Sequence, residues 1–325
     1  MFGGGIKTKI LVTGGSGFIG SHVVDKLREK GFEVRVFDMV MPTYRKDIEF
    51  YQASLLDFDA LRMALNGIDV VYHLGAVADV KDVYEDPHYA EAINVRGTIN
   101  VLEAARRSPT VRRVIYASTI WVYSDCKEKV VDEETPLPPP SHLYTATKLA
   151  SEYYCITYSK LYGLETTILR YGIPYGPRAR SGAVIPIFVS KALKGEPLTI
   201  AGDGSQFRKF VYVEDLAEGN VLALKSIAKN KIYNLDGKEK ITIRQIAETI
   251  QKILGKEIKI EYVPARPADF TGIEVSSEKT KRELGWEPKV SFEEGLRRYI
   301  EWYKKVEKER EEKWAQIDNI LRSQL

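Results

Sequence analysis

The sequence predicts an α/β fold, with a doubly wound parallel sheet followed by a smaller C-terminal α/β domain. In the first half, short apolar runs alternate with amphipathic helical patterns. The runs are apolar at nearly every position, as strands covered on both faces are. A Gly/Pro-rich break at 172–177 ends this alternation, and shorter mixed elements follow. We therefore expect a first domain over residues 1–171 and a second, mainly over 172–325.

The elements of the first half follow one another as strand and helix. The expected strands are residues 10–12, 34–37, 48–53, 68–74, 113–118 and 166–170. Helices are expected after Gly20, from Asp57, over 89–107 and over 143–162. Because parallel strands end at one edge of their sheet, we expect the residues that follow them to line one crevice.

The second half contains fewer regular patterns. Strands are expected at 210–213 and 232–235, within a stretch of about 207–237 that returns to the first sheet. A helix over 242–254 and a strand over 258–262 are assigned to the smaller, substrate-facing domain. From residue 292 onward, the charge pattern is typical of a solvent-facing helix stabilised by i,i+4 pairs.

The composition indicates a globular, cytoplasmic protein. The net charge of +3 is spread along the chain, so no basic face predicts nucleic-acid binding. No run approaches the roughly 18 apolar residues that span a bilayer, and the N-terminus lacks a signal peptide's apolar core, so no membrane partner is expected. The two cysteines and four histidines show no ligand spacing, which predicts no metal site.

A glycine-rich loop links the first apolar run to the first helix. Gly14, Gly17 and Gly20 let the backbone approach a pyrophosphate, and the helix N-terminus offers it N–H groups. Such a triplet also occurs in ordinary strand-to-helix turns. Here Asp38 ends the next strand about 20 residues further on, where an acid binds ribose hydroxyls and repels the 2′-phosphate of NADP. The pattern predicts a Rossmann-type domain that binds NAD.

A tyrosine and a lysine share one face of the helix expected over 143–162. Tyr144 and Lys148 are four residues apart. Lowering a tyrosine pKa from about 10 to 7 takes about 4 kcal/mol, which an ammonium and a cationic nicotinamide are suited to supply. Ser118 and Thr119 end the preceding strand, and Thr119 is expected to hydrogen-bond the substrate oxygen that Tyr144 deprotonates.

Further motifs accompany these residues, at 13–20, 73–76, 94–98, 117–119, 170–177, 202–208, 210–215, 266–267 and 284–288. With them the chain resembles the extended short-chain dehydrogenase/reductase family over residues 9–303, in particular its nucleotide-sugar epimerases and dehydratases.

The resemblance implies a function for each group of residues. Thr119, Tyr144 and Lys148 are the implied catalytic residues. The implied NAD-binding residues are Gly14, Gly17, Phe18, Ile19, Gly20, Asp38, Ser54, Leu55, Leu74, Gly75, Ala76, Asn94, Ser118, Tyr144, Lys148 and Tyr171. The implied substrate-binding residues are Ala78, Asp79, Thr119, Tyr144, Ile173, Arg208 and Arg266, with the two arginines on the diphosphate of a nucleotide sugar. The resemblance also implies a homodimer through the helices over 89–107 and 143–162.

The departures from the family pattern include two binding positions. Ser54 stands where an acid usually contacts adenine, although a hydroxyl can still accept a hydrogen bond from the adenine amine. Ile173 replaces the asparagine of the common R-Y-x-N segment, which usually contacts sugar or phosphate. The identity of the sugar nucleotide therefore stays open.

The two residues after Thr119 narrow the reaction. Dehydratases of this family have Asp-Glu there, decarboxylases a glutamate at the second position and 3,5-epimerases a cysteine, whereas this chain has Ile120 and Trp121. The prediction is an NAD-dependent nucleotide-sugar 4-epimerase that acts on a UDP-hexose through a 4-keto sugar. The alternatives are a nucleotide-sugar dehydrogenase or reductase and, in another class, a non-catalytic NAD-binding sensor or scaffold. The intact Thr119, Tyr144 and Lys148 count against the last.

Overall fold

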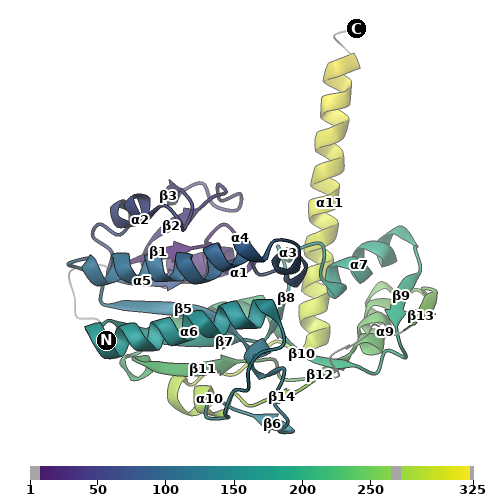
Figure 1. Ribbon diagram of the computed structural model, residues 1–325. Helices are drawn as coiled ribbons and strands as arrows, with labels where there is room; N and C mark the ends of the chain where they lie inside the picture. The colour runs from purple at the N-terminus through teal and green to yellow at the C-terminus, as the bar shows by residue number, and fades with distance from the viewer. Residues whose placement is uncertain (1–7, 265–271, 323–325) are drawn as a thin grey trace. The chain divides into compact units, whose positions relative to one another are not determined.

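The computed structural model describes residues 8–264 and 272–322 (Figure 1). The chain divides into two compact units. Unit 1 comprises Met1–Pro174, Lys209–Lys238 and Gly272–Lys289, and unit 2 comprises Tyr175–Arg208, Glu239–Thr271 and Val290–Leu325. Among the described residues, no helix combines the length and apolar character that a bilayer span requires.

Unit 1 is built on a seven-stranded sheet in the described part of the chain, with order β11-β7-β5-β4-β1-β2-β3. Its neighbouring strands pair in parallel throughout. The strands are β1 (Lys9–Thr13), β2 (Glu33–Asp38), β3 (Glu49–Gln52), β4 (Val70–His73), β5 (Arg113–Thr119), β7 (Glu165–Tyr171) and β11 (Lys231–Leu235). This sheet confirms the predicted doubly wound α/β class.

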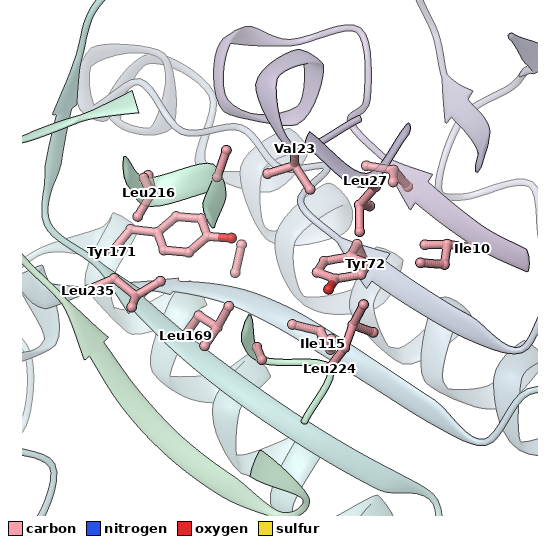
Figure 2. Packing of buried hydrophobic residues seen from close by; sticks show 14 of the residues in the cluster. Ile10, Val23, Leu27, Tyr72, Ile115, Leu169, Tyr171, Leu216, Leu224 and Leu235 are labelled. Atoms are coloured by element: carbon pink, nitrogen blue, oxygen red, sulfur yellow. The ribbon is translucent and has the colours of Figure 1, made fainter. Parts of the chain in front are cut away.

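Helices cover both faces of this sheet. Helices α1 (Phe18–Glu29) and α8 (Val213–Leu222) pack together on one face; α2 (Phe58–Ala64), α5 (Gly97–Arg107) and α6 (Leu143–Tyr162) cover the other (Figure 1). Side chains alternate along β1, so Ile10 packs with the first group and Leu11 with the second. Figure 2 shows the first cluster, in which Val23 and Leu27 of α1 lie beside Tyr72 of β4.

Two strands were expected to return to this sheet, and one of them does. β11 pairs with β7, with Asn234 opposite Arg170. The other, β10 (Phe207–Tyr212), belongs instead to a three-stranded sheet with β8 (Ile173–Tyr175) and β12 (Lys240–Thr242). The expectation for β10 was therefore wrong, because β11 already occupies the open edge of β7.

The single helix expected over 89–107 is a succession of three helical segments. It begins as α4 (Pro87–Glu91), continues as a π-helical turn, η1 (Ala92–Arg96), and ends as α5. The start lies earlier than expected because Pro87 occupies the first turn and the Asp86 carboxylate accepts the Tyr89 N–H at 2.9 Å. The π-helical turn contains Asn94, a predicted cofactor residue; such turns are frequent at functional sites.

The remaining elements of unit 1 are short. They are α3 (Val80–Glu85), η2 (Ile120–Tyr123), β6 (Val130–Val131), η3 (Ser226–Ala228), β14 (Glu274–Val275) and α10 (Glu278–Leu284). β6 and β14 pair in parallel. The helix expected from Asp57 is α2, and the Asp57 side chain caps it by accepting the Ala60 N–H at 2.9 Å.

Unit 2 contains a parallel pair of strands, β9 (Leu198–Ala201) and β13 (Ile260–Val263), with the helices α7 (Val184–Lys194) and α9 (Ile243–Leu254). A capping box between Thr242 and Gln245 begins α9. The chain then forms the long helix α11 (Phe292–Arg322), whose first turns carry i,i+4 pairs such as Arg298–Glu294, as the charge pattern predicted.

Candidate active site

The carboxyl ends of the unit 1 strands meet at one edge of the sheet, as expected. On β5 and β7, Thr119 lies opposite Tyr171. On β1 and β4, Thr13 lies opposite His73, so Leu74, Gly75 and Ala76 leave the sheet at the same edge. Open parallel sheets bind ligands at this edge.

The loop after β1 is so tightly packed that two of its glycines have no room for a side chain. A Cβ on Gly14, whose φ is +69°, would lie 2.6 Å from the Gly75 nitrogen. A Cβ on Gly20 would lie 2.0 Å from the Gly14 carbonyl oxygen. Gly17 caps α1 without a side-chain acceptor, so the first-turn N–H groups, among them those of Phe18 and Ile19, are offered to a phosphate.

Asp38 is held beside this loop by backbone donors. One of its carboxylate oxygens accepts the Ser16 N–H and the other the Val40 N–H, both at 3.1 Å. A carboxylate oxygen has two acceptor positions, so each can still accept a ribose hydroxyl. A negative charge here disfavours a 2′-phosphate, and the geometry fits NAD rather than NADP.

Asn94 connects the loop after β4 to the candidate catalytic helix. Its amide oxygen accepts the Val77 N–H at 2.8 Å, and its amide nitrogen donates to the Val77 carbonyl and the Thr147 hydroxyl, both at 3.0 Å. Leu55 lies on the other side of this loop, with its Cδ1 3.1 Å from where a Gly75 Cβ would be. Ser54 uses its hydroxyl to accept the Leu56 N–H at 3.2 Å.

Tyr144 and Lys148 lie one turn apart on α6, whose bounds agree with the prediction. Tyr144 is half-buried, whereas Lys148 is only 4% exposed, with its Nζ 4.5 Å from the centre of the Tyr116 ring. Burial lowers the pKa of Lys148 to about 8, and the charge of Glu152 opposes that shift. A buried ammonium of this kind can stabilise a nearby phenolate strongly.

Thr119 ends β5 and caps the turn that follows. Its hydroxyl oxygen accepts the Trp121 N–H at 3.1 Å at the start of η2. The hydroxyl proton remains available for a substrate oxygen.

Two predicted cofactor residues use their side chains elsewhere. The Ser118 hydroxyl donates to Glu152, and the Tyr171 hydroxyl donates to Asn220 at 2.5 Å in the core beneath α8. Any contact of Tyr171 with the cofactor therefore falls to its backbone.

The predicted substrate residues are divided between the two units. Ala78 is exposed, Asp79 caps α3 by accepting the Lys81 N–H at 2.9 Å, and Ile173 begins β8. Arg208 belongs to unit 2, where its guanidinium donates to the Phe207 carbonyl at 2.7 Å. Arg266 lies outside the described residues.

The sequence reasoning missed a buried polar network under α6. Arg170 of β7 and Glu152 of α6 form a two-point ion pair, at 3.0 and 2.8 Å, and each is 3% exposed or less. Arg170 also donates to the Tyr123 hydroxyl at 2.7 Å, which donates to Asn234 at 3.0 Å. The available signal was the spacing of Glu152, four residues after Lys148 on a face of the helix that has to be buried.

The model of the NAD dependent epimerase/dehydratase family matches residues 10–236. The chain belongs to this family. Its cofactor is therefore NAD, and the glycine loop, the first turn of α1 and Asp38 are the residues that fit it.

Curated relatives in this family differ in their reactions at similar identity. A putative UDP-glucose 4-epimerase of Methanocaldococcus jannaschii is 36% identical over 304 residues, covering 91% of this chain and 98% of that protein. A UDP-N-acetyl-alpha-D-glucosaminuronate decarboxylase of Bacillus cytotoxicus is 32% identical, covering 93% and 99%.

Solved structures of the family share the fold over nearly the whole chain. The UDP-glucose 4-epimerase of Thermotoga maritima with UDP-glucose has a TM-score of 0.87 at 34% identity, covering 92% of this chain and 99% of that one. The UDP-glucose 4-epimerase of Thermus thermophilus in complex with NAD has a TM-score of 0.83 at 36% identity, covering 91% and 99%. The chain is thus an enzyme of the NAD-dependent epimerase/dehydratase family.

Proposed function

We propose that the protein is a nucleotide-sugar 4-epimerase that acts on a UDP-hexose. The observation that carries this proposal is the turn after Thr119. None of the four residues of η2, at 120–123, is an acid or a cysteine, so this turn supplies no group for elimination, decarboxylation or proton transfer at C3 or C5. Thr119, Tyr144 and Lys148 suffice for chemistry at a single carbinol carbon.

In this proposal Tyr144 removes the proton of the C4 hydroxyl, while Thr119 donates a hydrogen bond to the same oxygen. The Lys148 ammonium favours the phenolate form of Tyr144. Bound NAD supplies the hydride acceptor and donor for C4. The 4-keto sugar turns within the site, and Tyr144 returns its proton to the oxygen after the other face is presented. Inversion at C4 follows with no net oxidation.

In this proposal Arg208 and Arg266 bind the diphosphate, as the family resemblance implies. A guanidinium fork matches phosphate oxygens, and each well-formed contact contributes about 1.5–3 kcal/mol. The relative named as a 4-epimerase supports the reaction class. The relative named as a decarboxylase catalyses a different reaction, but it supports a UDP-sugar as the substrate.

The test is incubation of the purified protein with UDP-, GDP-, CDP- and dTDP-sugars, followed by chromatography of products and measurement of absorbance at 340 nm. We expect interconversion of a UDP-hexose and its C4 epimer with no growth of free NADH. Release of NADH in step with a keto sugar would replace the epimerase by a dehydrogenase. NAD binding with no turnover of any sugar would favour the sensor or scaffold.

A further inference from the structure

Lys148 is buried beside titratable groups of α6, β5 and β4. Among the described residues, the titratable groups that act on it include Glu152 and Cys155 on α6, Tyr116 on β5 and His73 on β4. Burial lowers the pKa of His73 to about 3 and raises the pKa of Tyr116 and of Cys155. These three groups are therefore neutral near pH 7. Of the four, Glu152 is the one that carries a negative charge, and it lies one helical turn after Lys148 on the same face of α6.

The Glu152 carboxylate is fixed on several sides. Arg170 binds both of its oxygens, and the Ser118 hydroxyl donates to one of them. Tyr123 and Asn234 continue the network behind Arg170. A carboxylate held this way cannot rotate toward solvent, and its charge acts on Lys148 through a poorly screened interior.

We propose that Glu152 is a positioning residue: it is the internal counter-charge that keeps the Lys148 ammonium charged in its buried site, and Arg170 limits this effect by sharing the carboxylate. The proposal deepens the proposed function and rests on it for the role of Lys148.

The proposal makes two predictions of opposite sign. Without the charge of Glu152, Lys148 loses its proton at a lower pH, because burial then acts unopposed. Without Arg170 but with Glu152 in place, Lys148 keeps its proton to a higher pH, because the carboxylate has no competing cation. A purely structural ion pair predicts no such opposite movement.

The variants are chosen to avoid an unpaired buried charge wherever the chain allows it. The double variant Glu152→Gln/Arg170→Gln removes both charges and keeps hydrogen-bonding groups. Arg170→Gln alone tests the opposite sign, and Glu152→Asp keeps the charge. The matched control is Arg113→Gln/Glu165→Gln, an ion pair between β5 and β7 at the end of these strands away from Thr119 and Tyr171.

The readout is the titration of Lys148 in the full-length protein, labelled with ¹³C at lysine Cε and assigned with Lys148→Met. We expect the midpoint to fall by at least about half a pH unit in the double variant, to rise in Arg170→Gln and to stay in place in the control. In Glu152→Asp we expect the midpoint to stay near the native value. If the double variant does not fold, the single variants Glu152→Asp and Arg170→Gln together test the proposal. An unchanged Lys148 midpoint in a folded double variant overturns the proposal. So does a midpoint that moves in the same direction in the double variant and in Arg170→Gln.

Kinetics give the second readout. The high-pH limb of kcat for UDP-hexose epimerisation is expected to move with the Lys148 midpoint in each variant. If the midpoint moves as stated but no sugar is epimerised, the proposed function fails and the role of Glu152 stands. If epimerisation occurs and the midpoint does not move, the reverse holds.

Discussion

At the scale of single residues, one chain of hydrogen bonds holds the loops that follow β1 and β4. The Gly75 N–H donates to the Thr13 hydroxyl at 3.2 Å, and Thr13 lies 2.8 Å from Nδ1 of His73. Nε2 of His73 lies 2.9 Å from the hydroxyl of Thr98, which donates to the Asn94 carbonyl. Since burial lowers the pKa of His73 to about 3, the ring is neutral, with its proton on Nε2. One buried histidine thereby connects the loops after β1 and β4 to the π-helical turn.

The first residue-scale prediction concerns Tyr144. In Tyr144→Phe we expect the fold and NAD binding to persist, while kcat falls by a factor on the order of 10²–10⁴, because general-base action is removed. Steady-state rates and the amount of bound NAD measure the two effects. Tyr154→Phe, an exposed position on the same helix, is the control and should keep the native rate. Equal loss in both variants would place the base elsewhere.

The second residue-scale prediction concerns Asp236, which follows β11 and is 1% exposed. Burial raises its pKa to about 7, while the Gly237 N–H and the charge of Lys209 lower it. The folded state therefore binds this proton more tightly than the unfolded chain, in which the pKa is about 3.9. This contribution to stability is full below about pH 4 and is lost as the pH rises through 7, by up to about 1.4 kcal/mol per pH unit.

Asp236→Asn removes the titration, so the variant is expected to gain stability relative to the native protein between pH 4.5 and pH 8. Urea unfolding at both pH values gives the difference in free energy of unfolding. Asp59→Asn, at an exposed carboxylate of α2, is the matched control and is expected to show no such trend. A difference that stays constant with pH for Asp236→Asn would contradict the prediction.

At the scale of elements, helix starts and turns position the groups that the strands deliver to the sheet edge. Gly17 ends the loop after β1 where α1 begins, so the helix N-terminus lies at the carboxyl edge. The π-helical turn η1 places one extra residue in its helical turn, and its Asn94 contacts both Val77 and Thr147. Cofactor loop and candidate catalytic helix are thus joined through one amide.

The element-scale prediction is that Gly20→Ala disrupts the start of α1. The new Cβ would meet the backbone oxygen of Gly14 at 2.0 Å, and backbone cannot rotate away as a side chain does. We expect a loss of at least about 1–3 kcal/mol of stability and a large loss of NAD affinity. Thermal unfolding and calorimetric titration with NAD measure these. Gly182→Ala, where a Cβ meets nothing within 4 Å, is the control. Native NAD affinity in Gly20→Ala would mean that the loop binds the cofactor differently.

At the scale of the whole molecule, α6 leaves large apolar side chains exposed in the single chain. Tyr153, Leu161 and Tyr162 are 60%, 68% and 52% exposed. Exposed apolar side chains are available to an interface. The homodimer through the helices expected over 89–107 and 143–162 stays a prediction.

The prediction at this scale is a molar mass of twice 36.9 kDa in light scattering at micromolar concentration. A charge at the centre of the proposed interface is costly to bury, so Tyr153→Glu is expected to shift the protein toward the monomer. Tyr262→Glu, at a tyrosine of unit 2 that is 52% exposed, should leave the mass unchanged. A monomer mass for the native protein would exclude the dimer at this concentration.

The parts of this protein that depend on local order could be predicted from its residues alone. The strand and helix alternation, the glycine loop, the cap at Asp57 and the bounds of α6 all follow from periodicity and from residue types within a few positions of one another. The family followed from the same short motifs. The roles assigned to the site residues remain predictions.

Which distant segments meet could not be predicted from local patterns, because it depends on packing across the chain. It placed β11 rather than β10 beside β7, and it paired Glu152 with Arg170 from the neighbouring strand. Glu152 and Arg170 are ordinary charged residues in the sequence, and no local pattern predicts that both are buried as a pair. Burial and pairing are properties of the packed sheet and helix. A charge is desolvated, and its partner compensates for this cost, only when α6 packs against the sheet.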